Sequence, residues 1–314
     1  MKAELPRVSI GMPVYNDEKF LRHALNSLLA QDFRDFELII SDNASTDGTE
    51  DICQEYAGRD PRIRYHRNPT NVGASANFNQ VFRLSSGGEY FMWAGGHDLW
   101  APTYLSRCVS LLDGDRSIVL CNSGALYMSQ DGKEFPGVIR QIDTRRYGRF
   151  VGANLVLWQA STFLCYCVMR SSALRQTRLM LPDSCATDLI LGFELSLLGG
   201  FALVPETLFF MRDNRGEHAT PKDRAQRARS NAAFRQRLFP GPNAPKVGLL
   251  RSLFPVDGLN AVRRSPLPWP LRIGLMGCVM ATMSIGFYSH LPGSLRRTIR
   301  SVLNRISARS LEQR

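Results

Sequence analysis

The pair His97 and Asp98 is the first candidate for chemistry in this chain. Both residues lie in the segment AGGHDLW, directly after an apolar run. A divalent metal ion on a diphosphate needs hard oxygen ligands, commonly one or two carboxylates together with phosphate oxygens and water. Asp98 can supply one carboxylate, and the preceding glycines let the backbone come close to a ligand. The plainer alternative is that Asp98 caps a helix predicted for APTYLSRCVSLL.

Asp42 and Asp188 are two further candidate carboxylates. Asp42 follows the apolar run FELIIS, where it could accept a hydrogen bond from a nucleobase N–H or a ribose hydroxyl. The segment DNASTDG is also favourable turn sequence. Asp188 begins the segment DLILGFELSLLGG, where it could be a general base in a cleft or simply stabilise a helix N-terminus. The residues alone leave both alternatives open.

One histidine and three arginines complete the candidates. His218 follows FFMRDNRGE and could be a metal ligand, a phosphate contact or a surface histidine. Arg67, Arg212 and Arg215 could neutralise phosphate charge. In so basic a chain, a solvated arginine is the plainer alternative for each of them.

The elements that must position these residues alternate along the first hundred residues. Apolar runs typical of buried strands lie at residues 7–12, 36–41, 63–68 and 89–95. Helical patterns follow the first three, and Asn16 is expected to cap the first helix. This alternation predicts a parallel sheet with helices on both faces. Ligands bind beyond the carboxyl ends of such strands. We therefore expect four groups to converge on one cleft, namely residues 13–16, 42–47, 67–73 and 95–98.

The second half of the domain is predicted to extend this sheet. A strand at IVLCNSGALYM is followed by a hairpin turn at Asp131-Gly132, and a helix at residues 187–198 ends at Gly199-Gly200. The closing strand, FALVPETLFFMR, is expected to bend at Pro205. FLCYCVMRSSALR is predicted as strand then helix, with Cys165 and Cys167 on one face of the strand.

Cysteine usage indicates the compartment. The seven cysteines form no CxxC pair, which favours reduced thiols and a cytoplasmic protein. The start MKAELPRVSIGMPVYN leads directly into strand sequence, so no signal peptide is expected.

Positive charge is concentrated at the C-terminus. The net charge of the chain is +11, and residues 211–314 hold 19 Lys and Arg against 5 Asp and Glu. Residues 1–210 hold 20 against 23. Such asymmetry suggests an anionic partner, either a membrane or a nucleic acid. A solvated, helix-rich tail is the equally weighted alternative. The tail lacks the aromatic interleaving of a nucleic-acid module, so no nucleic-acid partner is expected.

Three patterns subdivide this tail. Residues 240–270 are proline-rich and predict an irregular linker. Residues 273–288 carry no charge, but sixteen residues fall short of the roughly 20 needed to span a bilayer. Residues 295–306 place apolar side chains on one helical face and arginines on the other. Such a helix could lie in a membrane interface or pack on its own domain.

Several of these segments, taken in order, resemble the family-2 glycosyltransferases of the GT-A fold. The resemblance is carried by VSIGMPVYNDEKFLRHALNSLLAQ, FELIISDNASTDGT, IRYHRNPTNVGASANFN, EYFMWAGGHDLWAP, FLCYCVMRSSALR and ATDLILGFELSLLGGFALVPETLFF. It covers residues 7–218. It implies an α/β, Rossmann-like, mostly parallel sheet with flanking helices over residues 1–220, with a nucleotide-binding half at 1–100 and an acceptor-side half at 101–220. Residues 221–314 would form a helical, basic C-terminal extension.

The resemblance also assigns roles by position. It implies that Asp98 binds a divalent metal ion, Mn²⁺ or Mg²⁺, with His97 and His218 as further metal candidates, and that Asp188 is the catalytic base. The residues implied to bind the nucleotide sugar are Pro13, Tyr15, Asn16, Asp42, Asn43, Asn71, Gly73 and Asn77. His97 departs from the family, which commonly has a carboxylate there, and imidazole suits Mn²⁺ better than Mg²⁺. Asn43 likewise stands where a second aspartate is frequent.

The implied activity is transfer of a sugar, with inversion, from a nucleotide-diphosphate donor to a hydroxyl of a saccharide or lipid-linked acceptor. Family members often build cell-surface polysaccharides or glycolipids, so a peripheral position at the inner face of the cell membrane, through residues 271–314, is expected. Two alternatives remain. The depleted acidic motif would suit a catalytically degenerate nucleotide-sugar-binding protein, and a related α/β scaffold could transfer nucleotides and release pyrophosphate. DNASTDGT and TDLILGFELSLLGG disfavour the second.

Overall fold

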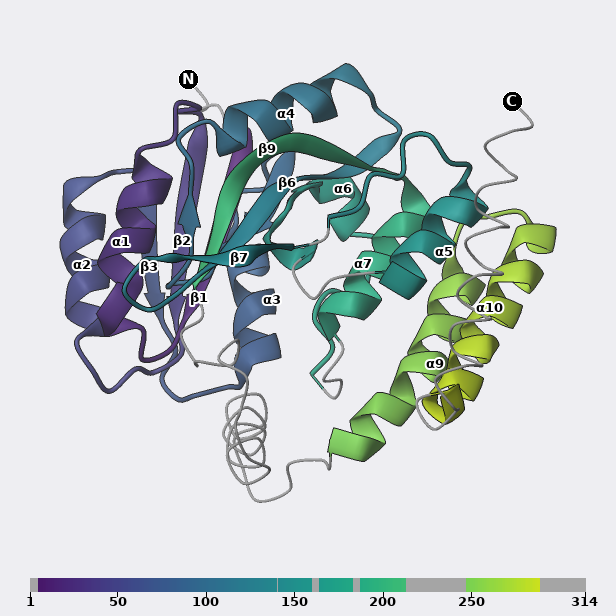
Figure 1. Cartoon of the computed structure of the whole chain (residues 1–314). Helices are drawn as coiled ribbons and strands as arrows, with labels where there is room; N and C mark the ends of the chain where they lie inside the picture. Colours follow the sequence, from purple (N-terminus) through teal and green to yellow (C-terminus); the bar gives the residue numbers. More distant parts are fainter. Residues whose placement is uncertain (1–4, 140, 160–163, 183–186, 213–246, 289–314) are drawn as a thin grey trace.

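The computed structural model describes residues 5–139, 141–159, 164–182, 187–212 and 247–288 (Figure 1). Within this part, nine strands form one sheet in the order β3-β2-β1-β4-β8-β6-β9-β5, and β7 pairs with β6 outside that path. The strands are β1 (Val8–Val14), β2 (Phe36–Asp42), β3 (Ile63–Arg67), β4 (Tyr90–Trp93), β5 (Leu99–Trp100), β6 (Ile118–Met128), β7 (Glu134–Ile139), β8 (Val168–Arg170) and β9 (Gly200–Arg212).

Helices connect and cover these strands. They are α1 (Glu18–Leu29), α2 (Thr49–Arg59), α3 (Ala74–Leu84), α4 (Tyr104–Gly114), α5 (Arg149–Gln159), the 3₁₀ helix η1 (Leu164–Tyr166), α6 (Ser171–Leu174), α7 (Thr187–Leu198), α9 (Val247–Arg264) and α10 (Trp269–Tyr288). The helices predicted after each of the first three strands are therefore confirmed.

The first half of the sheet is entirely parallel. Strand β1 pairs in parallel with β2 and with β4, and β2 pairs in parallel with β3. Strands β1, β2 and β4 are buried along nearly their whole length, which explains their continuous apolar sequences. Strand β1 runs through Pro13, which pairs with Ser41, and so ends two residues later than expected. The carboxyl ends of these four strands lie along one edge of the sheet.

The second half of the sheet is mixed. Strand β8 lies antiparallel to both β4 and β6, whereas β9 lies parallel to β6 and antiparallel to β5. The pairing steps from Val204 with Ser123 to Thr207 with Gly124, so Pro205 sits in a bulge and the predicted bend is confirmed. The turn at Asp131-Gly132 is confirmed as well, because β6 and β7 form an antiparallel pair around it and Gly132 has φ of 83°.

The prediction for Cys165 and Cys167 is wrong in part. Cys165 lies in η1 and Cys167 follows it, so they do not share a face of one strand. Both thiols are buried, and neither forms a disulfide within the described residues. Strand β8 is three residues long because the apolar segment before it forms the 3₁₀ turn that packs against α7.

Two helical layers enclose the sheet, as predicted. Apolar side chains of α1, α2 and α4 form one core with one face of the sheet, including Leu25, Ile52 and Leu105. Side chains of α3, α6 and α7, including Val81 and Leu191, form a second core with the other face. Figure 1 shows the purple and blue N-terminal half on one side of the molecule and the green helices on the other.

The C-terminal region differs from the expected linker. Residues 247–264 and 269–288 form α9 and α10, which pack together and against α5 and α7 through a third core that includes Phe193, Val262 and Leu275. The proline pattern misled the prediction because Pro266 and Pro268 fall in the turn between the helices and Pro270 in the first turn of α10, where proline removes no helical hydrogen bond.

Part of the expected tail is not described. The amphipathic segment at residues 295–306 lies outside the described residues, as do His218 and Arg215. Within the described residues, no helix has both the length and the apolar character needed to cross a bilayer.

Candidate active site

The loops after β1 and β2 are joined through Asn16. Asn16 has a left-handed φ of 54°, and its N–H donates to Ser45 Oγ at 2.9 Å. Its Oδ1 accepts from the Thr46 N–H at 2.9 Å. The sequence predicted that Asn16 caps α1, and this prediction is wrong. The side chain of Asn16 bridges to the neighbouring loop, and Asp17 takes the cap position.

Asp42 ends β2 and is fully buried with both carboxylate oxygens in use. Its Oδ1 accepts from the Ser45 N–H at 2.9 Å. Its Oδ2 accepts from the Tyr65 hydroxyl at 3.0 Å and pairs with Arg67 Nη1 at 2.6 Å. Burial, followed by the Asp42 carboxylate, raises the pKa of Tyr65 well above its usual range. Arg67, a candidate phosphate contact, is thus an ion partner of Asp42.

Asn43 and Asn71 organise the loop after β3. Asn43 Oδ1 accepts from the Val72 N–H at 2.9 Å, and its Nδ2 donates to Asn71 Oδ1 at 2.8 Å. Asn71 Oδ1 also accepts from the Gly73 N–H at 2.9 Å. Gly73 has φ of 87°, a conformation that favours glycine, and α3 begins directly after it.

Asn77 is buried beneath these loops. Its Nδ2 donates to the Ser41 carbonyl at 2.9 Å, while its Oδ1 accepts from Ser41 Oγ at 2.7 Å and Asn68 Nδ2 at 3.1 Å. Pro13 and Tyr15 lie at the same edge and are partly exposed. The four residues 42, 43, 71 and 77 therefore shape the rim with side chains that already bond to protein.

Asp98 differs because one of its oxygens remains without a partner. It is 1% exposed, and its Oδ1 accepts from the Arg212 N–H at 2.9 Å. Its buried Oδ2 has no hydrogen-bond partner within the described residues. Burial raises the pKa of Asp98, and the neighbouring His97 opposes that shift. A buried carboxylate oxygen without a partner is costly unless a cation or donor occupies it.

Gly95 keeps the space beside this oxygen open. A Cβ at Gly95 would lie 2.6 Å from Asp98 Oδ2, and one at Gly96 would lie 3.1 Å from Asp17 Oδ2. The two glycines are therefore needed for the close approach of the backbone to the carboxylates of Asp98 and Asp17. The sequence predicted a close approach to a ligand instead.

Asp17 is a site residue that the sequence prediction missed. Its Oδ1 lies 3.6 Å from His97 Nδ1, and His97 Nε2 lies 3.9 Å from Asp98 Oδ1. Asp17 looked like an ordinary residue at the start of a helix. The order β1-β4 in the sheet places its loop beside the loop of Asp98, and this order could not be obtained from the local pattern.

Arg212 holds the end of β9 against this loop. Its Nε donates to the His97 carbonyl at 3.0 Å, and its Nη1 donates to the carbonyls of Gln130 at 3.0 Å and Ser129 at 3.2 Å. Its guanidinium also lies over the Phe20 ring, and burial lowers its pKa. Because these bonds engage the Arg212 guanidinium within the protein, they disfavour a contact between Arg212 and phosphate.

Asp188 stands in the first turn of α7 and is partly buried. Its Oδ1 accepts from the Leu189 N–H at 2.9 Å. Burial raises its pKa to about 6. A carboxylate with such a pKa is ionised at neutral pH and is a stronger base than an ordinary aspartate, which suits proton abstraction. The predicted helix is confirmed, and Asp188 lies in its first turn rather than at the cap position.

Asp98 and Asp188 act on a common neighbour. The pKa of the buried Cys165 thiol is raised well above its usual value by burial and then by the charges of Asp188, Cys167 and Asp98. Helix η1, which carries Cys165, contacts both β4 and α7. Asp188 therefore lies on a helix that contacts η1, and Asp98 lies in the loop that follows a strand contacting η1.

The segment before α7 is held by side chains from two helices. The N–H groups of Arg178 and Met180 donate to Glu194 Oε2 at 2.8 Å and to Asn79 Oδ1 at 2.9 Å. Asn79 Nδ2 also donates to the Met180 carbonyl at 2.8 Å. Leu179, between them, has an unusual φ of 57°. Because Asn79 belongs to α3 and Glu194 to α7, this segment ties α3 to the helix that carries Asp188.

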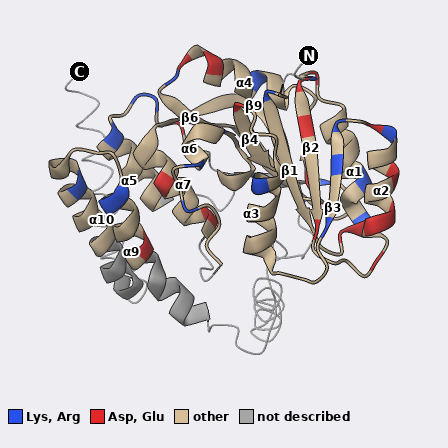
Figure 2. Ribbon diagram, turned by 180° about the vertical axis from the view of Figure 1, so that it is seen from behind, with Lys and Arg blue, Asp and Glu red and all other residues tan. Residues whose placement is uncertain are grey.

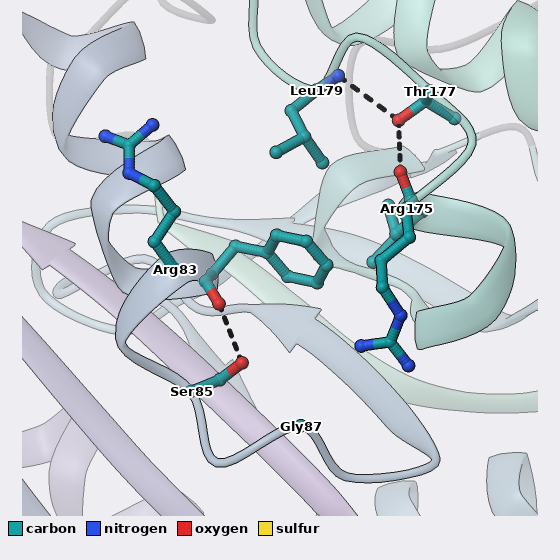
Figure 3. A pocket seen from close by; sticks show the side chains of 8 residues that line it. Arg83, Ser85, Gly87, Arg175, Thr177 and Leu179 are labelled. Atoms are coloured by element: carbon teal, nitrogen blue, oxygen red, sulfur yellow. Dashed lines mark hydrogen bonds between the residues drawn. The ribbon is translucent and has the colours of Figure 1, made fainter.

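A separate pocket of about 330 Å³ lies at the opposite edge of the sheet (Figure 3). It is lined by the end of α3, the loop before β4 and the residues after α6, including Phe82, Arg83, Arg175 and Leu179. Figure 3 shows the side chains of Arg83 and Arg175 on different sides of this pocket. This pocket is not formed by the carboxyl ends of the parallel strands.

A divalent ion fits the Asp98 site only with help from a ligand. No group of three or more His, Cys, Asp or Glu side chains that could hold a metal occurs in the described ranges. Nucleotide-bound Mg²⁺ and Mn²⁺ commonly need one or two protein carboxylates, with phosphate and water completing the shell. The unpartnered Asp98 Oδ2 and the open space beside Gly95 meet that smaller requirement.

Comparison with known proteins agrees with this geometry. Residues 9–177, more than half of the chain, match the family model described as Glycosyl transferase family 2. The chain belongs to this family. It is 30% identical over 142 residues to TuaG of Bacillus subtilis, provisionally named a teichuronic acid biosynthesis glycosyltransferase, covering 45% of this chain and 56% of TuaG. The chain spans about half the length of the curated relatives it matches.

Two solved structures share the fold. Staphylococcus aureus TarS 1–349 in complex with UDP-GlcNAc has a TM-score of 0.63 at 15% identity, covering 90% of this chain and 73% of that one. The mannosyltransferase PcManGT of Pyrobaculum calidifontis, in complex with GDP-Man and Mn²⁺, has a TM-score of 0.53 at 17% identity, covering 98% and 88%. These likenesses confirm the GT-A fold.

Proposed function

We propose that this protein transfers a sugar from a nucleoside-diphosphate sugar to a hydroxyl acceptor, with inversion at the anomeric carbon. The observation that carries the proposal is the buried, unpartnered Oδ2 of Asp98, at the carboxyl edge of the parallel strands. Membership of the family supports the reaction class, and Asp188 on a neighbouring element supplies a candidate base.

The donor lies across the ends of β1, β2 and β4 in this proposal. Asn16, Asp42 and Asn43 hold the loops that form its nucleotide rim, together with Pro13, Tyr15, Asn71, Gly73 and Asn77. Because the side chains of Asp42, Asn43 and Asn77 already bond to protein, we assign them mainly to shaping this rim.

Asp188 acts as the general base. It accepts the proton of the acceptor hydroxyl as that oxygen attacks the anomeric carbon. The bond between this carbon and the diphosphate oxygen breaks at the same time, and the diphosphate leaves with the electron pair. A single displacement of this kind inverts the anomeric configuration.

Asp98 is the proposed holder of a divalent ion, with His97 as a second candidate ligand. A bound Mn²⁺ or Mg²⁺ would supply positive charge to the leaving diphosphate. The Mn²⁺ in the mannosyltransferase structure supports this assignment. His218, the third metal candidate, lies outside the described residues and stays a sequence prediction.

The acceptor is proposed to be a saccharide or lipid-linked molecule in cell-surface polysaccharide or glycolipid synthesis. The name of TuaG supports this class of pathway. We retain the proposed division at residue 220, with a basic extension at residues 221–314, and the proposed contact of residues 271–314 with the inner face of the cell membrane. The concentration of Lys and Arg in the C-terminal third of the sequence supports this membrane contact.

The direct test is product analysis with a panel of nucleotide sugars that includes UDP-GlcNAc and GDP-mannose. We expect the nucleoside diphosphate to be released with a cognate acceptor, and thermal stability to rise with the preferred donor in the presence of Mn²⁺. Release of pyrophosphate would indicate nucleotidyl transfer. Binding of a donor without turnover of any acceptor would indicate the degenerate alternative, which the retained Asp98 and Asp188 disfavour.

A further inference from the structure

Helix α10 is apolar on two faces, and the described part of the chain packs against only one of them. Arg272 is its one charged residue between Trp269 and Tyr288. Leu275 and Val279 point into the core shared with α5, α7 and α9. A helix that is apolar all round is normally buried on all sides. The outer face of α10 therefore needs a partner.

The outer face presents large apolar side chains at helical spacing. Trp269 is 70% exposed, Ile273 is 57% exposed and Met280 is 48% exposed. Positions 269, 273 and 280 fall on one side of a helix with 3.6 residues per turn. We call this set the α10 stripe. Trp269 is the most exposed large apolar residue in the part of the chain that the structure describes.

The surroundings of the α10 stripe are cationic. Arg263 and Arg264 are exposed at the end of α9, next to the turn that leads to Trp269, and Arg272 lies within one turn of it. Figure 2 shows no red segment along α10, in agreement with Arg272 as its one charged residue. The nearby carboxylates are engaged, because Asp257 pairs with Arg178 at 2.7 Å and the buried Glu194 pairs with Arg178 and Arg264.

We infer that the α10 stripe and its arginines dock on an anionic lipid bilayer, with Trp269 at the interface. Tryptophan is enriched at the membrane interface because its ring is apolar and its N–H is polar. Arginines beside an apolar stripe gain from anionic lipid. Helix α10 does not have the length and apolar character to cross the bilayer, so it lies along the surface while its other face stays packed on the protein.

This inference deepens the proposed membrane contact by naming the face that makes it. It shifts the contact from the tail alone to a stripe that begins at Trp269, two residues before the segment predicted from the sequence. The opposite face of α10 packs with α7 in the third core, so docking would also orient the helix of Asp188 relative to a lipid-linked acceptor.

The test is co-sedimentation of the full-length chain with vesicles of phosphatidylcholine containing about one third phosphatidylglycerol, compared with pure phosphatidylcholine. We expect the wild type to bind the anionic vesicles more strongly, and less strongly as salt rises. The double variant Trp269→Ser, Ile273→Ser should lower the partition coefficient by about tenfold or more, since about 1.4 kcal/mol corresponds to tenfold.

Two full-length controls separate the face from other causes. Leu5→Ser removes an apolar side chain that is 62% exposed on the N-terminal segment, and it should leave vesicle binding unchanged. Replacing Arg296, Arg297, Arg300 and Arg305 by Gln tests the tail. If this tail variant loses binding while the α10 stripe variant keeps it, the inference is wrong.

Two further results would overturn the inference. One is a wild type that does not bind anionic vesicles. The other is a dimer, seen by light scattering, that the α10 stripe variant dissociates, because a second copy would then cover the face. Thermal shift with nucleotide sugars is measured in parallel. The α10 stripe variant should bind donor like the wild type, whereas absence of donor binding by both would reject the proposed function and leave the vesicle result standing.

Discussion

The candidate residues of the nucleotide rim and the two carboxylates Asp98 and Asp188 differ in how their polar atoms are used. Asp42 accepts from Ser45, Tyr65 and Arg67, and leaves neither oxygen without a bond. Asp98 keeps a buried oxygen without a partner in the described structure. Asp188 keeps a pKa near 6 because burial opposes its ionisation.

The difference separates two kinds of role. Side chains whose bonds are satisfied within the protein mainly fix loop shape, and their removal costs stability. Carboxylates that are buried without full compensation are costly in the folded state, and such groups concentrate at sites of chemistry. We therefore expect substitutions in the rim to change folding more than turnover, and substitutions at Asp98 and Asp188 to do the reverse.

The largest effect is expected at Asp188. Asp188→Asn should lower kcat by about 10²–10⁴-fold, the usual contribution of a general base. Donor affinity, measured by calorimetry on the same protein, should stay unchanged because the base does not hold the donor. Turnover at the wild-type rate would remove Asp188 from the mechanism.

The space beside Asp98 gives the next largest effect. In Gly95→Ala, the new Cβ would lie 2.6 Å from Asp98 Oδ2 and force the carboxylate or the loop to move. Displacement of this order can lower turnover by about 10²-fold. The matched control is Gly58→Ala on α2, whose Cβ would meet nothing within 4 Å. It should keep full activity. Equal rates for both variants would show that the close approach at Gly95 does not matter.

A rim residue should show the opposite balance. Asn77→Ala leaves the groups of Ser41 and Asn68 without their buried partner, at a cost of about 2–3 kcal/mol in the free energy of unfolding. Urea denaturation measures this loss, and Gln54→Ala, at an exposed position on α2, is the control. Below the unfolding temperature, Asn77→Ala should keep donor affinity near the wild-type value. A variant that is stable but no longer binds donor would place Asn77 in direct contact with it.

The smallest effect is the pH dependence of stability at Asp188. A pKa raised from 3.8 to about 6 means that the folded state binds this proton more tightly than the unfolded state. This contribution is fully present below about pH 4 and is lost as the pH rises through 6. The full shift would correspond to about 3 kcal/mol, and solvent screening of this partly exposed carboxyl group reduces it. Asp188→Asn should therefore gain about 1–2 kcal/mol relative to wild type between pH 4 and pH 8. A constant difference over this range would show that burial does not perturb Asp188.

Much of the parallel half could be predicted because its strands and helices carry strong local patterns. The four loops converge as predicted, with Asn16 touching the loop after β2, Asn43 the loop after β3, and Asp17 lying beside His97. Which residues contact each other within that cluster depends on sheet order and register. The pairing of Asp42 with Arg67 follows from their opposed positions on β2 and β3, which no single segment encodes.

The errors have a common physical origin. Asparagine is a favoured residue at helix caps, which is why the sequence predicts that Asn16 caps α1. In the folded chain its side chain instead accepts a hydrogen bond from the loop after β2. The prolines around the start of α10 predict a linker, but Pro266 and Pro268 lie in the turn before this helix and Pro270 lies in its first turn. The segment Arg178–Met180, which joins α3 to α7, gave no local signal because its partners, Asn79 and Glu194, come from elsewhere in the sequence.

The most direct test of the distinction between rim and reacting carboxylates is Mn²⁺ binding in the presence of a nucleoside diphosphate, followed by electron paramagnetic resonance. We predict that Asp98→Asn abolishes the signal of protein-bound Mn²⁺, whereas Asp42→Asn lowers stability and keeps that signal. Retention of bound Mn²⁺ by Asp98→Asn, or its loss in a folded Asp42→Asn, would contradict the account.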